Sequence, residues 1–159
     1  MQHLVELLAG ELGTRGLKLA TAESCTGGGI ASACTDLAGS SAWFDCGFVT
    51  YSNEAKMKLL GVPVEILAHH GAVSEATVVA MVRGAIARSD ADVAIAVSGI
   101  AGPGGGSASK PVGTVWMAWG NARRQQARCF RFTGDRLQVR AESVQAGLQA
   151  LLLWLRAQP

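Results

Sequence analysis

A hydroxyl and a thiol stand side by side in the stretch LATAESCTGGGIAS, residues 19–32, where an apolar run meets three consecutive glycines. Ser24 and Cys25 could each attack a carbonyl, and the glycines permit positive φ and close approach to the backbone. The N-terminus of a following helix favours an alkoxide, an oxyanion or a bound phosphate. Ser24 is therefore a candidate nucleophile, phosphate ligand or simple N-cap. Chemistry alone does not choose between it and Cys25, the stronger intrinsic nucleophile.

A serine nucleophile needs a base, and the histidines do not supply one. His3 is near the terminus, and the adjacent His69 and His70 cannot point one way on a helix or strand, so a Ser-His-Asp triad is poorly supported. A lysine can act as base when burial or neighbouring charge lowers its pKa. Lys56 follows Tyr51 in TYSNEAK, and the tyrosine hydroxyl could relay the proton or orient the amine. The alternative is a solvated lysine after a tyrosine that ends a strand.

The third segment with chemical potential is the glycine-rich SGIAGPGGGSASKPVG, residues 98–113. Its backbone N–H groups could wrap a ligand, or it could be a flexible connection between strands. Lys110 within it is interpreted as a support for the loop. A basic region follows, in which a guanidinium could hold a substrate phosphate, although positive residues also protect the edge strand of a sheet. Its arginines are Arg123, Arg124, Arg128, Arg131, Arg136 and Arg140.

Hydrophobic periodicity predicts the elements that must position these residues. Five strands are expected, at about residues 17–22, 43–51, 92–99, 114–120 and 127–132. One helix is expected before the first strand and another at the end of the chain. Three more are expected between them: one from the glycines at 27–29 to about Cys34, one that begins at the cap Ser52 or Asn53 and ends at Gly61, and one that begins after the cap Ser74. The apolar run 92–99 suits a central strand that is buried on both faces.

Alternation of strands and helices predicts an α/β fold, a three-layer α/β/α sandwich around a mixed sheet of about five strands. The last two strands are joined without a helix, so one antiparallel pair is expected. No repeat or linker divides the chain, and we expect one domain over residues 1–159. Loops at the carboxyl ends of strands gather the chemistry in open α/β sheets. The three segments above all follow a predicted strand, so they could share one site.

Composition excludes several classes of protein. Of the 159 residues, 49% are hydrophobic and 16% are charged, which is typical of a globular chain rather than a disordered one. A net charge of +2 gives no indication of nucleic-acid binding. No segment has the length of a membrane span or the pattern of a signal peptide. The four cysteines form no C-x-x-C pair, so a zinc site is disfavoured and reduced thiols in the cytoplasm are expected.

Several long motifs together resemble the CinA C-terminal domain family, and within it the stand-alone nicotinamide-nucleotide amidases. They are TAESCTGG, GSSAWFDCGFVTYSNEAKMKLLGV, HGAVSE, SGIAGPGGGSASKPVGTVW and GDRLQVR, and the likeness spans about residues 4–155. The resemblance implies an α/β/α sandwich and hydrolysis of nicotinamide mononucleotide to nicotinate mononucleotide and ammonia, a step of pyridine-nucleotide salvage. It implies neither a metal nor a cofactor. Longer relatives carry a further N-terminal domain, whose activities should not be transferred to this chain.

The resemblance also assigns roles to residues. It implies that Ser24 is the nucleophile and that Tyr51 and Lys56 are the other catalytic residues. Ser98 stands where many relatives carry threonine, and Cys46 where glycine is common in longer ones. We expect a phosphate contact from the last helix, first from Arg140 and next from Arg136. The expected substrate-binding residues are Cys25, Thr26, Gly27, Gly28, Ser98, Gly99, Gly102, Arg140 and Arg136.

Two other functions stay open from the residues alone. The first is a domain that binds a nucleotide without hydrolysing it, which would share the pocket but not need the nucleophile and base. The second, an interaction module for DNA uptake or recombination, has little support from the charge. The expected partner is the small-molecule substrate, with neither nucleic acid nor membrane, and a homodimer is an assembly that the sequence permits.

Overall fold

The structure, a computed structural model, describes residues 1–158, so residue 159 of the predicted domain lies outside the described part. Its strands are β1 (Leu19–Glu23), β2 (Phe44–Val49), β3 (Val93–Gly99), β4 (Thr114–Asn121) and β5 (Gln125–Arg131). They form one five-stranded sheet in the order β2-β1-β3-β4-β5. Strand β1 pairs in parallel with β2 and β3, whereas β4 runs antiparallel to β3 and β5. The mixed five-stranded sheet confirms the predicted fold class.

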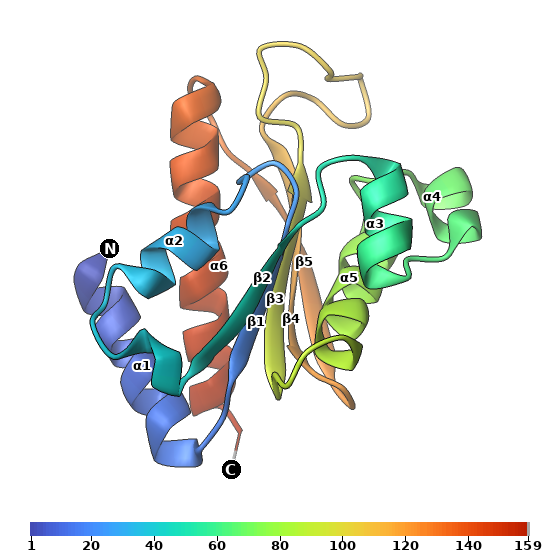
Figure 1. Ribbon diagram of the computed structural model, residues 1–159. Helices are drawn as coiled ribbons and strands as arrows, with labels where there is room; N and C mark the ends of the chain where they lie inside the picture. Colours follow the sequence, from blue (N-terminus) through green and yellow to red (C-terminus); the bar gives the residue numbers. More distant parts are fainter. Residues whose placement is uncertain (159) are drawn as a thin grey trace.

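The sheet has two antiparallel pairs, so the expectation of a single pair is wrong. The segment between β3 and β4 forms no helix within residues 100–113, and it returns the chain beside β3 in the opposite direction. A parallel return would have needed a crossover connection, usually a helix. The glycine-rich loop therefore stands above one end of the sheet, as Figure 1 shows.

Helices cover both faces of the sheet, which gives the three layers (Figure 1). On one face lie α1 (Gln2–Arg15), α2 (Gly29–Thr35) and α6 (Arg136–Arg156). On the other face lie α3 (Asn53–Leu60), α4 (Val64–His70) and α5 (Glu75–Ala87). A short 3-10 turn, η1 (Ser40–Ala42), precedes β2, and neither it nor α4 was predicted.

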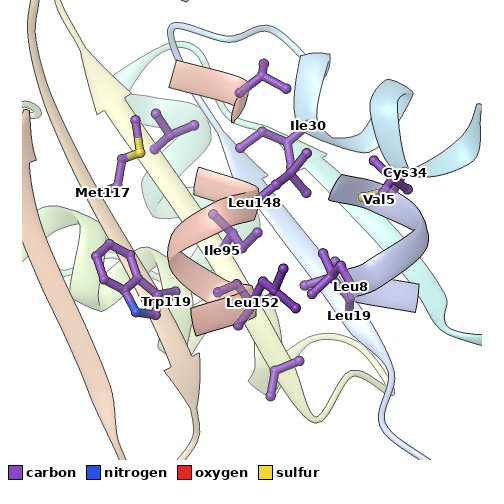
Figure 2. Close-up of a cluster of buried hydrophobic side chains, with 14 of the residues drawn as sticks. Val5, Leu8, Leu19, Ile30, Cys34, Ile95, Met117, Trp119, Leu148 and Leu152 are labelled. Atoms are coloured by element: carbon purple, nitrogen blue, oxygen red, sulfur yellow. The ribbon is translucent and has the colours of Figure 1, made fainter. Parts of the chain in front are cut away.

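Two apolar clusters hold the layers together. Figure 2 shows the larger one, in which Leu8 of α1, Ile30 of α2 and Leu148 of α6 meet Ile95 and Leu19 of the sheet. These five side chains are fully buried, and each such burial stabilises the fold by about 1.5–3 kcal/mol. The cluster on the other face is built on small strand residues, so α3 and α5 pack closely there; these are Ala20, Ala22, Ala94, Ala96 and Ala118.

Side-chain caps begin the helices that carry site residues. The Ser52 hydroxyl accepts from the Ala55 N–H at the start of α3, and Gly61 ends that helix in the left-handed conformation, as predicted. Asp135 and Gln138 form a capping box at the start of α6. In contrast, α2 begins at Gly29 rather than at Gly27, because Gly27 and Gly28 adopt positive φ values of 59° and 96° in the preceding turn.

The carboxyl ends of β1, β2 and β3 lie at the same edge of the sheet because these strands are parallel. The three predicted loops therefore meet there, as expected for open α/β sheets. Strand β5 is antiparallel to β4, so its end delivers the N-terminus of α6 to this edge as well. Topology thus brings four segments of the chain, far apart in sequence, around one place.

Candidate active site

Ser24 and Lys56 meet at this edge of the sheet. The Lys56 Nζ lies 3.0 Å from the Ser24 Oγ, and both side chains are buried, with 8% of Ser24 and 1% of Lys56 exposed. Alternation along β1 explains the direction of the serine: Ala22 packs under α3–α5, Glu23 points to the opposite face, and Ser24 points back towards α3. The pair is an alcohol in direct contact with an amine, as nucleophile and base must be.

The amine of Lys56 has no carboxylate partner. Its other neighbours are two backbone carbonyls, Thr50 O at 2.8 Å and Tyr51 O at 3.2 Å. No ion pair within residues 1–158 includes Lys56. Burial lowers the pKa of this amine from its ordinary value of 10.5, since the charged form loses its hydration without gaining a counter-ion. Such an environment favours a neutral amine that can accept a proton.

Cys25 is placed differently from its neighbour. Its side chain is 5% exposed and joins the apolar cluster between the sheet and α2 and α6. Burial raises the pKa of the Cys25 thiol to about 11, which disfavours the reactive thiolate at neutral pH. The alternative that sequence left open, a cysteine nucleophile, therefore finds no support in the geometry.

Tyr51 is near the pair with its backbone rather than with its hydroxyl. Its carbonyl accepts from Lys56, whereas its side chain is 61% exposed and its hydroxyl accepts from the Nη2 of Arg136 at 3.1 Å. Arg136 also donates from Nη1 to Gly102 O at 2.7 Å. Among the described residues no hydrogen bond joins the tyrosine hydroxyl to Ser24 or Lys56. Tyr51, Arg136 and Gly102 instead link the β2–α3 connection, α6 and the glycine-rich loop.

Arg140 holds the turn that carries the nucleophile. Its Nε donates to Cys25 O and its Nη2 to Thr26 O, both at 3.1 Å. The positive φ of Gly27 and Gly28 closes this turn before α2 begins. Arg140 was predicted as a phosphate ligand, but two of its donors already bind backbone carbonyls. Its Nη1 forms no hydrogen bond within residues 1–158.

The remaining predicted residues are less directly engaged. Ser98 is buried at the end of β3, next to Val97, whose carbonyl accepts from the Ser24 N–H at 3.0 Å. Gly99 follows it, and the Gly102 carbonyl accepts from Arg136. Lys110 donates to His70 O at 3.1 Å, which ties the glycine-rich loop to the end of α4 and agrees with a supporting role.

Sequence reasoning missed Glu23 and the Thr50 carbonyl. Glu23 is fully buried immediately before the nucleophile, and it accepts hydrogen bonds from Thr26, Ile30 and Ala31. A charged residue at the end of a strand whose five residues are all buried is a usable signal, because carboxylates are rarely buried without partners. A backbone carbonyl such as that of Thr50 leaves no such signal in the sequence.

Cavity size and metal ligands do not identify this site. A groove of about 480 Å³ between β5 and α6 is lined by Trp119, Phe130 and Leu153, among others, and by none of the predicted site residues. Within residues 1–158 no cluster of three or more histidine, cysteine, aspartate or glutamate side chains could bind a metal ion. The same residues include no helix with the length and apolarity needed to span a membrane.

Comparison with known proteins gives consistent matches over nearly the whole chain. The family described as CinA C-terminal domain matches residues 1–155. Nicotinamide-nucleotide amidohydrolase PncC of Escherichia coli K12 is 53% identical over 95% of this chain and 92% of its own length. The protein of the same name from Pseudomonas putida is 57% identical over 85% and 84%. The crystal structure of competence damage-inducible protein A (ComA) from Klebsiella pneumoniae has a TM-score of 0.96 at 45% identity, covering 99% of this chain and 98% of its own.

Proposed function

Because the chain belongs to the CinA C-terminal domain family, we propose that it is an amidohydrolase that converts nicotinamide mononucleotide to nicotinate mononucleotide and ammonia. The observation that carries the proposal is the buried contact of 3.0 Å between Ser24 Oγ and the Nζ of Lys56, an amine that has no counter-ion within residues 1–158. The substrate is a phosphorylated intermediate of NAD metabolism, so we place the activity in the cytoplasm.

The first half-reaction begins with a neutral Lys56. A neutral amine has two N–H groups and one lone pair, and the carbonyls of Thr50 and Tyr51 can take the two N–H groups. In the resting structure the amine donates to Ser24 Oγ at 3.0 Å and the Ser24 hydroxyl donates to Tyr51 O at 3.4 Å. In the neutral amine the lone pair is left to face Ser24, and the hydroxyl turns from Tyr51 O to donate its proton to it. As Lys56 takes this proton, the Ser24 oxygen bonds to the carboxamide carbon. The C–N bond breaks, the departing nitrogen receives the proton from Lys56, and ammonia leaves a nicotinoyl ester on Ser24.

Backbone N–H groups of the nucleophile turn can stabilise the oxyanion. The N–H groups of Cys25 and Thr26 donate to no acceptor within residues 1–158, although both residues are at least nine-tenths buried. Both N–H groups are therefore available to donate to a substrate oxygen. The C=O and N–H of a trans peptide point in opposite directions. Arg140 binds the Cys25 carbonyl, and the Thr26 N–H belongs to the same peptide group. This N–H therefore points away from Arg140.

The second half-reaction releases the acid. Lys56 takes a proton from water, whose oxygen bonds to the ester carbon, and returns it to the Ser24 oxygen as the ester bond breaks. The positive charge of the pyridinium ring makes the carbonyl carbon more electrophilic in both halves. The product differs from the substrate by a carboxylate, which helps to separate the two.

The direct test is ammonia release from nicotinamide mononucleotide by the purified protein. The proposal expects stoichiometric formation of nicotinate mononucleotide with multiple turnovers. Binding of the nucleotide, measured by calorimetry, without any ammonia would instead favour the alternative of a non-catalytic nucleotide-binding domain.

We expect the phosphate to bind near Arg136 and the free Nη1 of Arg140. Replacing each arginine with alanine should change different kinetic constants. Arg136→Ala should mainly raise KM, because this exposed side chain carries no part of the nucleophile turn. Arg140→Ala should also lower kcat, because it releases the carbonyls of Cys25 and Thr26. Steady-state kinetics on nicotinamide mononucleotide and on its riboside, which lacks the phosphate, measures both effects. Equal efficiency on the two compounds in the wild type would contradict a phosphate site.

For Tyr51 we expect a change in substrate binding more than in the chemical step. Its hydroxyl binds Arg136 and its backbone carbonyl, which any residue would supply, orients Lys56. Tyr51→Phe should therefore raise KM and leave kcat within about tenfold of the wild type. A residue in the proton route would cost about 10²–10⁴ in rate. A loss of kcat of that size in Tyr51→Phe would show that the tyrosine hydroxyl takes part in proton transfer, in line with the catalytic role that the family resemblance implies.

A further inference from the structure

Among residues 1–158, Glu23 is the carboxylate that lies against the nucleophile turn, and it is fully buried. Its side chain is 0% exposed and forms no ion pair within residues 1–158. Four groups donate to it instead: Thr26 Oγ1 at 2.6 Å, Ile30 N at 2.8 Å, Ala31 N at 3.0 Å and Thr21 Oγ1 at 3.2 Å. A buried charge is tolerated only with such partners, so these contacts define one geometry for the segment around it.

The two backbone donors belong to the first turn of α2. Ile30 and Ala31 are the second and third residues of the helix, whose N–H groups have no partner inside it. Because Glu23 already binds them, the helix end is not open to a substrate oxyanion or phosphate. Within residues 24–31 the N–H groups that donate to no acceptor are those of Cys25, Thr26 and Gly28, all in the turn. This differs from the expectation that the field of the helix N-terminus acts directly on Ser24, which lies five residues before Gly29.

We propose that Glu23 is a positioning residue for the reaction: through Thr26 it holds the nucleophile turn so that the N–H groups of Cys25 and Thr26 face the reacting carbonyl. The inference rests on the proposed amidase function and adds a residue to it. Arg140 acts on the same turn from the other side, by binding the carbonyls of Cys25 and Thr26. Glu23 binds the Thr26 side chain and anchors it to α2. Arg140 thus orients the peptide group that carries the Thr26 N–H. The Cys25 N–H shares its peptide group with Ser24 O, which accepts from the Gly27 N–H at 3.0 Å.

The chain supplies a matched pair of variants for the test. Thr21 and Thr26 are both buried, with 0% and 1% exposed, and both donate a hydroxyl to Glu23. Thr26 is in the nucleophile turn, whereas Thr21 is in the middle of β1. Thr→Val at either position removes one hydrogen bond to the same carboxylate and keeps the shape of the side chain. A purely structural role for Glu23 predicts equal consequences of the two changes.

The positioning role predicts unequal consequences. Thr26→Val should lower kcat by roughly 10-fold to 100-fold, the range expected when reacting groups are displaced by up to about 1 Å, with KM within about threefold. Thr21→Val should lower the melting temperature by a similar amount to Thr26→Val but keep the wild-type kcat. Glu23→Gln should lower kcat at least as much as Thr26→Val, because its amide N–H₂ opposes one of the donors that the carboxylate accepts. Equal kcat in the two threonine variants would overturn the proposal.

A second readout separates this inference from the choice of substrate. A fluorophosphonate probe phosphonylates an activated serine: the Ser24 oxygen bonds to phosphorus, fluoride leaves, and Lys56 takes the proton. The labelling rate of Ser24, followed by intact-protein mass spectrometry, should fall in Thr26→Val and Glu23→Gln but not in Thr21→Val. If the wild type is labelled yet does not hydrolyse nicotinamide mononucleotide, the substrate is wrong, and the labelling rates of the variants alone decide the positioning role. Unchanged labelling in Thr26→Val, or a wild-type serine that is neither labelled nor active, would overturn the role.

Discussion

Ser24→Ala is expected to retain almost no amidase activity, whereas Cys25→Ala keeps most of it. The Ser24 hydroxyl is the group in contact with the Lys56 amine. Cys25 is buried in the apolar cluster, and burial raises the pKa of its thiol to about 11. Loss of a nucleophile costs roughly 10⁴-fold or more in kcat. Cys25→Ala removes packing contacts of the side chain but keeps the backbone N–H that we propose stabilises the oxyanion.

The measurement is ammonia release by both variants at matched concentration, with circular dichroism to show that each is folded. Quenching the wild type during turnover should trap the nicotinoyl group on the peptide that contains residue 24. Fragmentation that located the adduct on Cys25, or full activity in Ser24→Ala, would reverse the assignment of the two neighbours.

The second large effect is expected at Lys56. Lys56→Met keeps the length of the side chain in its buried site but removes the amine, so the protein should fold and lose turnover by about 10²–10⁴-fold or more. Lys58→Met is the matched control, because Lys58 lies on the same helix, α3, with an exposed side chain. Activity near the wild-type value in Lys56→Met would exclude the lysine as the base.

The pH dependence of the wild type tests the same residue without a mutation. The base acts when neutral, so kcat/KM should fall as the pH drops below the pKa of Lys56. Burial lowers this pKa from its ordinary value of 10.5, which moves the acid limb of the profile to a lower pH than an exposed lysine would give. An acid limb centred near 10.5 would show that Lys56 is not desolvated during the reaction.

The strand pattern and the caps could be predicted from sequence because their causes are local. Alternation and apolar runs depend on which faces of a strand are buried, and Ser52, Ser74 and Gly61 act on backbone groups within a few residues. The helix α4 was missed because it begins after Pro63 without a side-chain cap and buries only Leu67, so it shows neither a cap nor an apolar stripe. The direction of β4 was missed because the glycine-rich connection carries no local sign of how it returns to the sheet.

The residue types of the candidate site were likewise visible in the sequence. Parallel strands bring the segments after β1 and β2 to one edge, so the meeting of Ser24 with Lys56 follows from the strand order. The sequence motifs also singled out Arg136 and Arg140, and both lie at this edge. Residue types and the elements that they follow made these residues candidates, and the resemblance to the CinA C-terminal domain family implied their roles.

The partners of each side chain were decided only by the tertiary structure. Sequence could not tell that Tyr51 offers its carbonyl to Lys56 and its hydroxyl to Arg136, or that Arg140 binds the turn of the nucleophile. Burial also depends on contacts between distant segments, and it sets the lowered pKa of Lys56 and the raised pKa of Cys25. The sequence by itself determined which groups are available for chemistry. Packing between the layers decided which of these groups are buried from solvent, which are neutral and which contact one another. The reason is that desolvation and hydrogen-bond geometry are properties of the folded chain.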